Sequence, residues 1–274
     1  MSKLLSAGFA RLWKSKLFYL ELAIAAILAC TALTSQYREM VNYNVDVPLE
    51  HAIFNCTPFM LFFAAAFIAL FTGSEYSDGT IRNKLVVGHA RADVYLSNLI
   101  VNCAAVLIPY FVLLIIPFAV GWGLFGFFTV PLSRVLLTLL NALLMIVAAC
   151  ALFTLLAMLV SNKAANGVIC LILVFLLFFA GMYLQNSLDE PEIYQNYIIF
   201  VDGVPVMGDP EPNPRYLTGV KRQVYQFLYD FLPMGQAIHV ADYTFRWYYP
   251  LYSLLLASIA TAAGLPLFRR KDIK

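Results

Sequence analysis

The segment between the second and third apolar runs of the chain is dense in ionisable and polar side chains. Residues 73–98 read GSEYSDGTIRNKLVVGHARADVYLSN and include Glu75, Asp78, Arg82, Lys84, His89, Arg91, Asp93 and Tyr95. Such a segment could make polar contacts with a partner protein, or it could be a solvated connector between two membrane spans. Which interpretation holds depends on the elements around it and on the side of the membrane it faces.

Other kinds of chemistry have no motif in this sequence. The sequence contains no G-x-x-x-x-G-K-[ST] loop, no H-E-x-x-H and no G-x-S-x-G, so neither ATP binding through a P-loop nor zinc or serine hydrolysis is indicated. The three histidines lie in separate segments, and the five cysteines form no C-x-x-C pair, which argues against a metal site or a disulfide framework. We expect a chain that is not an enzyme, binds no cofactor or metal itself and has no nucleic-acid partner.

The composition places the surrounding elements in a membrane. Of the 274 residues, 62% are hydrophobic and 12% are charged, whereas soluble domains carry about 25% charged residues. Six apolar stretches are long enough for a bilayer core of about 30 Å. They span about 17–35, 53–72, 94–120, 132–160, 165–185 and 247–267. The sequence therefore predicts one all-α integral membrane domain over residues 1–274, a multi-pass protein in the lipid bilayer, with kinks at Pro109 and Pro117 in the third span.

The distribution of basic residues predicts the orientation. With both termini in the cytoplasm, the inner segments hold twelve Lys and Arg residues and the short outer loops hold two, Arg38 and Arg134. Because cytoplasmic loops carry the excess of Lys and Arg, we expect both termini and the 73–98 segment on the cytoplasmic side.

Two amphipathic segments flank the spans. Residues 1–16 place Leu5, Phe9, Leu12 and Trp13 at helical spacing among basic residues, which predicts a helix in the membrane interface rather than a cleavable signal. Residues 186–246 form the large water-exposed, extracellular region. Within it, Asp202–Gly203 between apolar flanks predicts a hairpin. Residues 219–232 predict an amphipathic helix that packs on the spans or lies at the outer surface.

Glu21 is the clearest charge inside a predicted span. An intramembrane carboxylate indicates function, because burying a charge in the bilayer is costly. Alternatively, Glu21 lies near the inner interface and pairs with Lys14 or Lys16, which is the interpretation we favour. The spans lack a set of ionisable groups or broken helices at mid-membrane, so ion-coupled transport has little support.

The 73–98 segment also has a local structural pattern. Asp78–Gly79 predicts a turn, and Thr80 is expected to cap a helix of about two turns over 80–87. In that helix Arg82 and Asn83 would project to one side, and Leu85 and Val86 to another. A short helix with one polar and one apolar face suits docking into a groove of another protein.

The stretch EYSDGTIRNKLVVGHARADVYLS resembles the first cytoplasmic loop of ABC-2 type ABC transporter permeases. The similar features are Glu75, Gly79–Thr80, Arg82, Lys84–Leu85, Gly88, Arg91 and the run from Tyr95 to Ser97. His89–Ala90 departs from the small or Ser-like residues expected before Arg91. The interfacial helix, the six spans, LPMGQ at 232–236 and LFRRKDIK at 267–274 extend the resemblance along essentially the whole chain.

The resemblance implies a bacterial cytoplasmic-membrane exporter with a type V exporter-like fold. Two permease copies would pair as a homodimer, and each would dock a separate P-loop ABC ATPase that binds ATP and Mg. Docking would use a coupling helix at about 77–88, within a coupling loop over 73–93. Glu75 and Arg82 would make polar contacts, Gly79 and Gly88 would let the backbone turn, and Leu85 and Val86 would pack into the ATPase. The full set of expected coupling residues is Glu75, Gly79, Thr80, Arg82, Asn83, Leu85, Val86, Gly88 and Arg91.

The spans also suggest the kind of cargo. Candidate pathway-lining residues are Glu21, Phe59, Phe62, Phe63 and Phe67, although helix packing or lipid contact would equally explain the phenylalanines. The chain has 22 Phe and 16 Tyr and no charged rings of the kind that select ions. We therefore expect a hydrophobic or amphipathic cargo. Among such cargoes, the resemblance to ABC-2 permeases implies export of, or immunity to, toxin or antimicrobial peptides first and drug or lipid export second. An ion-coupled secondary transporter and a membrane scaffold that uses 186–246 for recognition remain alternatives.

Overall fold

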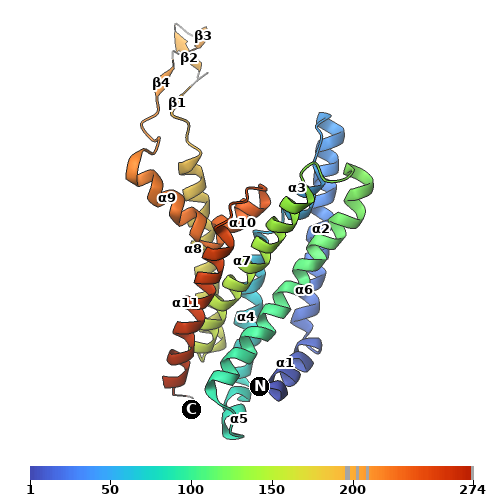
Figure 1. Ribbon diagram of the computed structural model, residues 1–274, viewed down its shortest axis with the longest axis vertical. Coiled ribbons are helices and arrows are strands. Elements are labelled where there is room, and N and C mark those ends of the chain that lie inside the picture. The colour runs from blue at the N-terminus through green and yellow to red at the C-terminus, as the bar shows by residue number, and fades with distance from the viewer. Residues whose placement is uncertain (195–197, 202–203, 208–209, 273–274) are drawn as a thin grey trace.

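Six helices of membrane-spanning length form the body of the computed structural model, which describes residues 1–194, 198–201, 204–207 and 210–272 (Figure 1). They coincide with the six predicted apolar stretches, and most extend beyond them. Their bounds are α2 (Lys16–Tyr43), α3 (Leu49–Phe54) followed by α4 (Phe59–Ser77), α6 (Arg91–Phe125), α7 (Leu132–Leu159), α8 (Lys163–Leu188) and α11 (Tyr249–Arg270). The all-α membrane fold predicted from the sequence is confirmed.

Proline interrupts the second span but not the third. The second is divided into α3 and α4 around Pro58, which precedes the first residue of α4. Proline has no amide hydrogen and disfavours helical backbone in the residue before it, so the helix is interrupted over residues 55–58. The predicted second span, 53–72, lies within the Leu49–Ser77 span. Pro109 and Pro117, in contrast, lie inside one continuous helix, α6, of 35 residues.

Helix α7 lies at the centre of the bundle and packs against α4, α6, α8 and α11. Its buried face is rich in alanine, including Ala142, Ala149 and Ala157, and small side chains let helix backbones approach closely. Helix α2 packs mainly on α6, and α8 packs mainly on α4. Close approach also explains Gly264 of α11, where an added Cβ would lie 2.1 Å from the Tyr95 hydroxyl.

Both chain termini and the short helix α5 (Thr80–Val86) lie at one end of the bundle (Figure 1). The N-terminal helix α1 (Ser2–Trp13) buries Leu4 and Leu12 and packs along α6. At Gly8 an added Cβ would lie 2.7 Å from Val101 Cγ2. The predicted amphipathic helix is therefore present, and it packs against α6 of the bundle.

At the opposite end, the segment between α8 and α11 forms an arm and two helices (Figure 1). In the arm, β1 (Ile193–Tyr194) pairs with β4 (Glu211–Pro212), and β2 (Ile198–Val201) pairs antiparallel with β3 (Val204–Met207). The register Val201↔Val204 agrees with the predicted hairpin, whose turn residues Asp202 and Gly203 lie outside the described residues.

The helices that follow are α9 (Gly219–Phe231) and α10 (Pro233–Ala241). Val220, Val224 and Phe227 on the apolar side of α9 are exposed, and α9 also packs against α8 and α11, where the Phe227 ring lies 5.8 Å from that of Tyr252. Both expected positions are therefore realised in part. All of α10 is buried against α7 and α8, and our prediction that 186–246 is water-exposed throughout is wrong there. An added Cβ at Gly235 would lie 1.9 Å from the Tyr229 carbonyl oxygen, which requires glycine for this close packing.

Candidate coupling site

Helix α5 projects from the end of the bundle between two glycine turns. Gly79 precedes it with φ of 66°, and Gly88 follows it with φ of 97°. Left-handed backbone of this kind favours glycine, because a Cβ strains it even where space is free. Gly79 is the N-cap residue, and Thr80 is the first residue of the helix and makes no capping hydrogen bond. The prediction that Thr80 caps the helix is therefore wrong, since the sharp turn already ends at Gly79.

The two sides of α5 differ from those predicted. Ile81 is fully buried and Leu85 is half-buried in a small cluster with Leu4, Val94, Tyr95, Met158 and Phe268. Val86 is 78% exposed, and Arg82 and Asn83 are exposed with it. Leu85 and Val86 thus point in different directions, because successive residues of a helix are about 100° apart. The free surface of α5 consists of Arg82, Asn83, Val86 and the adjacent Val87.

Glu75 lies behind this surface and is only 2% exposed. Its carboxylate forms an ion pair with Arg11, accepts a hydrogen bond from Lys84 Nζ at 2.6 Å and accepts another from Asn98 Nδ2 at 2.8 Å. These residues, the Glu75 cluster, join α1, α4, α5 and α6. A buried carboxylate is stable only when paired in this way. Glu75 therefore supports α5 from within the chain and, in this conformation, is not available to a partner protein.

Sequence reasoning did not predict the partners of Glu75, and it counted Arg11 only as one basic residue of an interfacial helix. Its guanidinium donates hydrogen bonds to the Phe71 carbonyl oxygen and to Ser74 Oγ, and it lies 3.8 Å from the centre of the Phe71 ring. Burial lowers the pKa of Arg11, and the neighbouring Glu75 carboxylate opposes that shift. No spacing rule links residues so far apart in sequence.

Arg91, predicted as a coupling residue, binds the end of α11. Its guanidinium donates to the carbonyl oxygens of Phe268 at 3.2 Å, Arg269 at 3.1 Å and Lys271, which satisfies the free carbonyls at a helix C-terminus. Lys271 Nζ in turn donates to the Tyr76 hydroxyl at 2.8 Å and to the Met158 carbonyl at 3.0 Å. The C-terminal end of the chain is thereby held on the helix that precedes α5.

The Lys271 contact predicts a pH dependence. Desolvation lowers the pKa of Lys271 to about 8, whereas the unfolded chain titrates near 10.4. Between these values the unfolded state binds more protons, so the free energy of unfolding should rise with pH. We expect the midpoint of thermal unfolding of wild type to rise between pH 8 and 9.5 relative to that of Lys271→Met. Identical pH profiles would contradict a lowered pKa of Lys271 in the folded protein.

The predicted pathway residues do not form one surface. Phe62 packs against Phe175 and Phe178 of α8, with ring centres 5.5 and 5.7 Å apart. Phe67 is buried and stacks on Phe71 at 4.9 Å, and Phe59 is 49% exposed. Phe63 and Phe67 lie beside Glu21 in a cavity between α2 and α4.

Glu21 differs from the favoured expectation. It is only 5% exposed, and among the described residues neither oxygen of its carboxylate has a hydrogen-bond partner or an ion pair. The expected pairing with Lys14 or Lys16 is wrong, because both lysines are exposed and Glu21 faces into the bundle.

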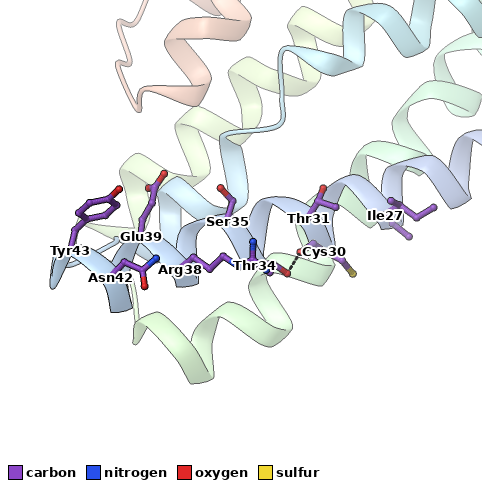
Figure 2. Close-up of a pocket in the computed structure, with 10 residues that line it drawn as sticks. Ile27, Cys30, Thr31, Thr34, Ser35, Arg38, Glu39, Asn42 and Tyr43 are labelled. Carbon is purple, nitrogen blue, oxygen red and sulfur yellow. Dashed lines mark hydrogen bonds between the residues drawn. The ribbon is translucent and has the colours of Figure 1, made fainter.

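The outer half of α2 carries a polar surface that the hydropathy pattern did not reveal. An open hollow of about 820 Å³ lies along this helix and is lined by ten of its residues, from Ala26 to Tyr43. Figure 2 shows these side chains along α2. The polar members of this set are Cys30, Thr31, Thr34, Ser35, Arg38, Glu39, Asn42 and Tyr43. Polar side chains on the outside of a span usually face water or a partner rather than lipid, so this face of α2 is a candidate pathway or subunit contact.

Comparison with known proteins indicates the family of this chain. The model of the ABC-2 family transporter proteins matches residues 23–200, which is more than half of the chain and includes α4, α5 and α6. A comparison with proteins of curated function found no match. The membrane fold and the coverage of the family match lead to one conclusion: this chain belongs to the ABC-2 family of transporter proteins, as the membrane permease of an ABC transporter rather than its ATPase.

Proposed function

We propose that this permease serves an ATP-driven exporter and docks its ATPase subunit through the exposed face of α5. The observation that carries the proposal is the contrast between the two sides of that helix. Arg82, Asn83 and Val86 are free, while the opposite side is tied to α1, α4 and α6 through Ile81 and the Glu75 cluster. A docking helix must present a free surface and also transmit displacement to the spans.

In this scheme the ATPase binds ATP and Mg, and this chain supplies the moving membrane part. Closure of the ATPase would displace α5, and the Glu75 cluster would pass that displacement to α4 and α6. Further inside, Asn102 of α6 donates hydrogen bonds to Thr72 of α4 at 3.2 Å and to Thr154 of α7 at 3.0 Å. These bonds would extend the connection into the centre of the bundle.

A second copy of the chain would complete the transport pathway. The polar outer half of α2 and the exposed apolar face of α8 support a seam with another permease. The apolar wall of the small cavity beside Phe63 and Phe67 suits a hydrophobic or amphipathic cargo. We propose amphipathic peptides as the first class to test, with drugs and lipids as the second.

Charge reversal and charge insertion on α5 test the docking. We expect Arg82→Glu and Val86→Asp to reduce copurification of the ATPase subunit at least tenfold, because a desolvated unpaired charge at an interface costs about 2–5 kcal/mol. The permease should still insert and elute as a single species, since both side chains are exposed. The measurement is quantitative mass spectrometry of complexes purified in mild detergent from the native host.

Lys14→Glu is the matched control, because Lys14, in the connection between α1 and α2, is also an exposed basic residue and lies outside α5. It should leave the copurified amount unchanged. Equal amounts of ATPase with wild type, Arg82→Glu and Val86→Asp would rule out α5 as the docking element.

A further inference from the structure

The base of the arm meets α8 and α9 at the end of the bundle opposite α5 (Figure 1), and an open hollow of about 740 Å³ lies where they join. The last turns of α8, the loop over 214–218 and the first turns of α9 provide most of its wall. Its volume lies within the range of about 300–1,000 Å³ that is usual for small-molecule sites. Charged, amide and hydroxyl side chains line it, most of them exposed, so a ligand in the hollow can reach polar groups.

The charged groups of the hollow carry an excess of positive charge. Arg215 and Lys221 are exposed, and neither forms an ion pair with any of the described residues. Glu190 is the one acid among the lining residues, and its carboxylate accepts a hydrogen bond from Asn213 Nδ2 at 2.8 Å. Two cations thus face one carboxylate that is already hydrogen-bonded, and a ligand with a single negative charge would neutralise the remainder.

The tyrosines of the hollow do not favour a cationic ligand. Lys221 Nζ lies 5.7 Å from the centre of the Tyr225 ring, and the Arg222 guanidinium lies 5.1 Å from that of Tyr216. Cations of the chain therefore already occupy a face of each ring, where a ligand ammonium group would otherwise bind. An anion fits this wall better than a cation.

The surroundings of the hollow indicate the source of such an anion. Helix α9, which provides Lys221, exposes Val220, Val224 and Phe227 on a neighbouring face, and helices of this kind lie in the membrane interface. Tyrosines are enriched at the same level. The hollow also adjoins the end of α8, which is long and apolar enough to cross a bilayer. A lipid headgroup at this level would reach the hollow while its acyl chains contact apolar side chains.

We propose that this hollow binds the phosphodiester headgroup of an anionic membrane lipid, in the leaflet at the arm end of the bundle. Arg215 and Lys221 would pair with the phosphate. The Tyr183 hydroxyl, 3.4 Å from that of Tyr225, and the exposed Asn186 amide would bond a headgroup that carries hydroxyls. This site goes beyond the proposed function and is independent of coupling, because α5 contributes no residue to it.

The test is photolabelling of the full-length permease in lipid nanodiscs. Phosphatidylglycerol and phosphatidylcholine, each with a diazirine near the top of one acyl chain, are compared by mass spectrometry of labelled peptides from residues 183–225. We expect about tenfold more labelling by the anionic lipid, because hydrogen bonds to charged groups are the strong ones. Arg215→Gln and Lys221→Gln should each reduce that labelling about fivefold. Arg134→Gln, which changes an exposed arginine of α7 outside the hollow, should leave it unchanged.

Two further measurements separate this site from a general effect of charge and from a soluble ligand. Asn186→Trp fills the hollow from an exposed position and keeps both cations, so labelling should also fall. Unlabelled phosphatidylglycerol should compete far better than its deacylated headgroup, glycerophosphoglycerol, which lacks the acyl chains.

Equal labelling of wild type by the two lipids, or unchanged labelling in both Arg215→Gln and Lys221→Gln, would overturn the proposal. Equal competition by the free headgroup would overturn the lipid as its source. Because the assay contains no ATPase, a failed ATPase copurification would count against the proposed function and not against this site.

Discussion

Replacing Glu75 by alanine is expected to reduce the free energy of unfolding by about 3–5 kcal/mol, the usual cost of removing one partner from a buried ion pair. The change leaves Arg11 and Lys84 without their carboxylate in a site where Glu75 is 2% exposed. It also removes the acceptor for Asn98. The measurement is equilibrium unfolding of the purified permease in detergent micelles.

Glu39→Ala is the matched control for Glu75→Ala. Glu39 is an exposed acid near the C-terminal end of α2 and has no ion pair among the described residues. Its loss should therefore change the free energy of unfolding by less than about 0.5 kcal/mol. Combining Glu75→Ala with Arg11→Met should cost less than the sum of the single changes, because residues in one ion-pair network are coupled by about 0.5–3 kcal/mol. Additive effects would mean that Arg11 and Glu75 act independently.

The same cluster connects α5 to three other helices. Arg11 also donates a hydrogen bond to the Phe71 carbonyl oxygen, so a second polar contact joins α1 to α4. Lys84 comes from α5 itself and Asn98 from α6. Direct polar contacts therefore join α5 to three other helices. If α5 moves, these contacts would transmit the displacement with more directional control than apolar contacts alone.

The second large effect is expected at the opposite end, where Asp230 holds α9, α10 and α11 together. Asp230 is 3% exposed; Gln226 donates to Oδ1 at 2.8 Å, His239 Nε2 lies 2.9 Å from Oδ1, and Tyr248 donates to Oδ2 at 3.0 Å. Removing a carboxylate that satisfies several buried donors should cost about 3 kcal/mol. We expect Asp230→Ala to lower the unfolding free energy by that amount.

The matched control is Asp242→Ala, which changes an exposed aspartate just beyond α10. It should have little effect on unfolding. Limited proteolysis gives a local readout, since loss of the Asp230 contacts should expose the α9–α10 connection to cleavage while the spans stay intact. Resistance equal to that of wild type would show that apolar packing of α10 is sufficient to hold these helices.

The contacts of Asp230 also predict how the stability of the outer helices changes at acidic pH. Burial by itself would raise its pKa, but the hydrogen bonds from His239, Gln226 and Tyr248 outweigh burial and hold the pKa below its usual range. For a carboxyl with a lowered pKa, the stabilisation is present above about pH 4 and is lost as pH falls through the folded-state value. Asp230→Asn should reduce this acid-dependent loss of stability.

Much of this architecture follows from the sequence alone. Continuous apolar runs determine the membrane helices, because no other structure satisfies the backbone in lipid over such lengths. The glycines at 79 and 88 mark the ends of α5 because they adopt backbone angles that other residues avoid. The similarity of residues 75–97 to ABC-2 permeases also pointed to the family, since the features of this loop are local in sequence.

Only the tertiary structure decided which polar groups meet. The ion pair of Arg11 with Glu75 joins residues 64 positions apart, and the contact of Lys271 with Tyr76 spans 195 positions. No helical period encodes such distances, because they depend on how α1 and α11 pack on the bundle. The burial of α10 and the isolation of Glu21 were decided in the same way. Each depends on which face of a helix its neighbours cover, and apolar spans that are hydrophobic on all sides do not record that choice in their sequence.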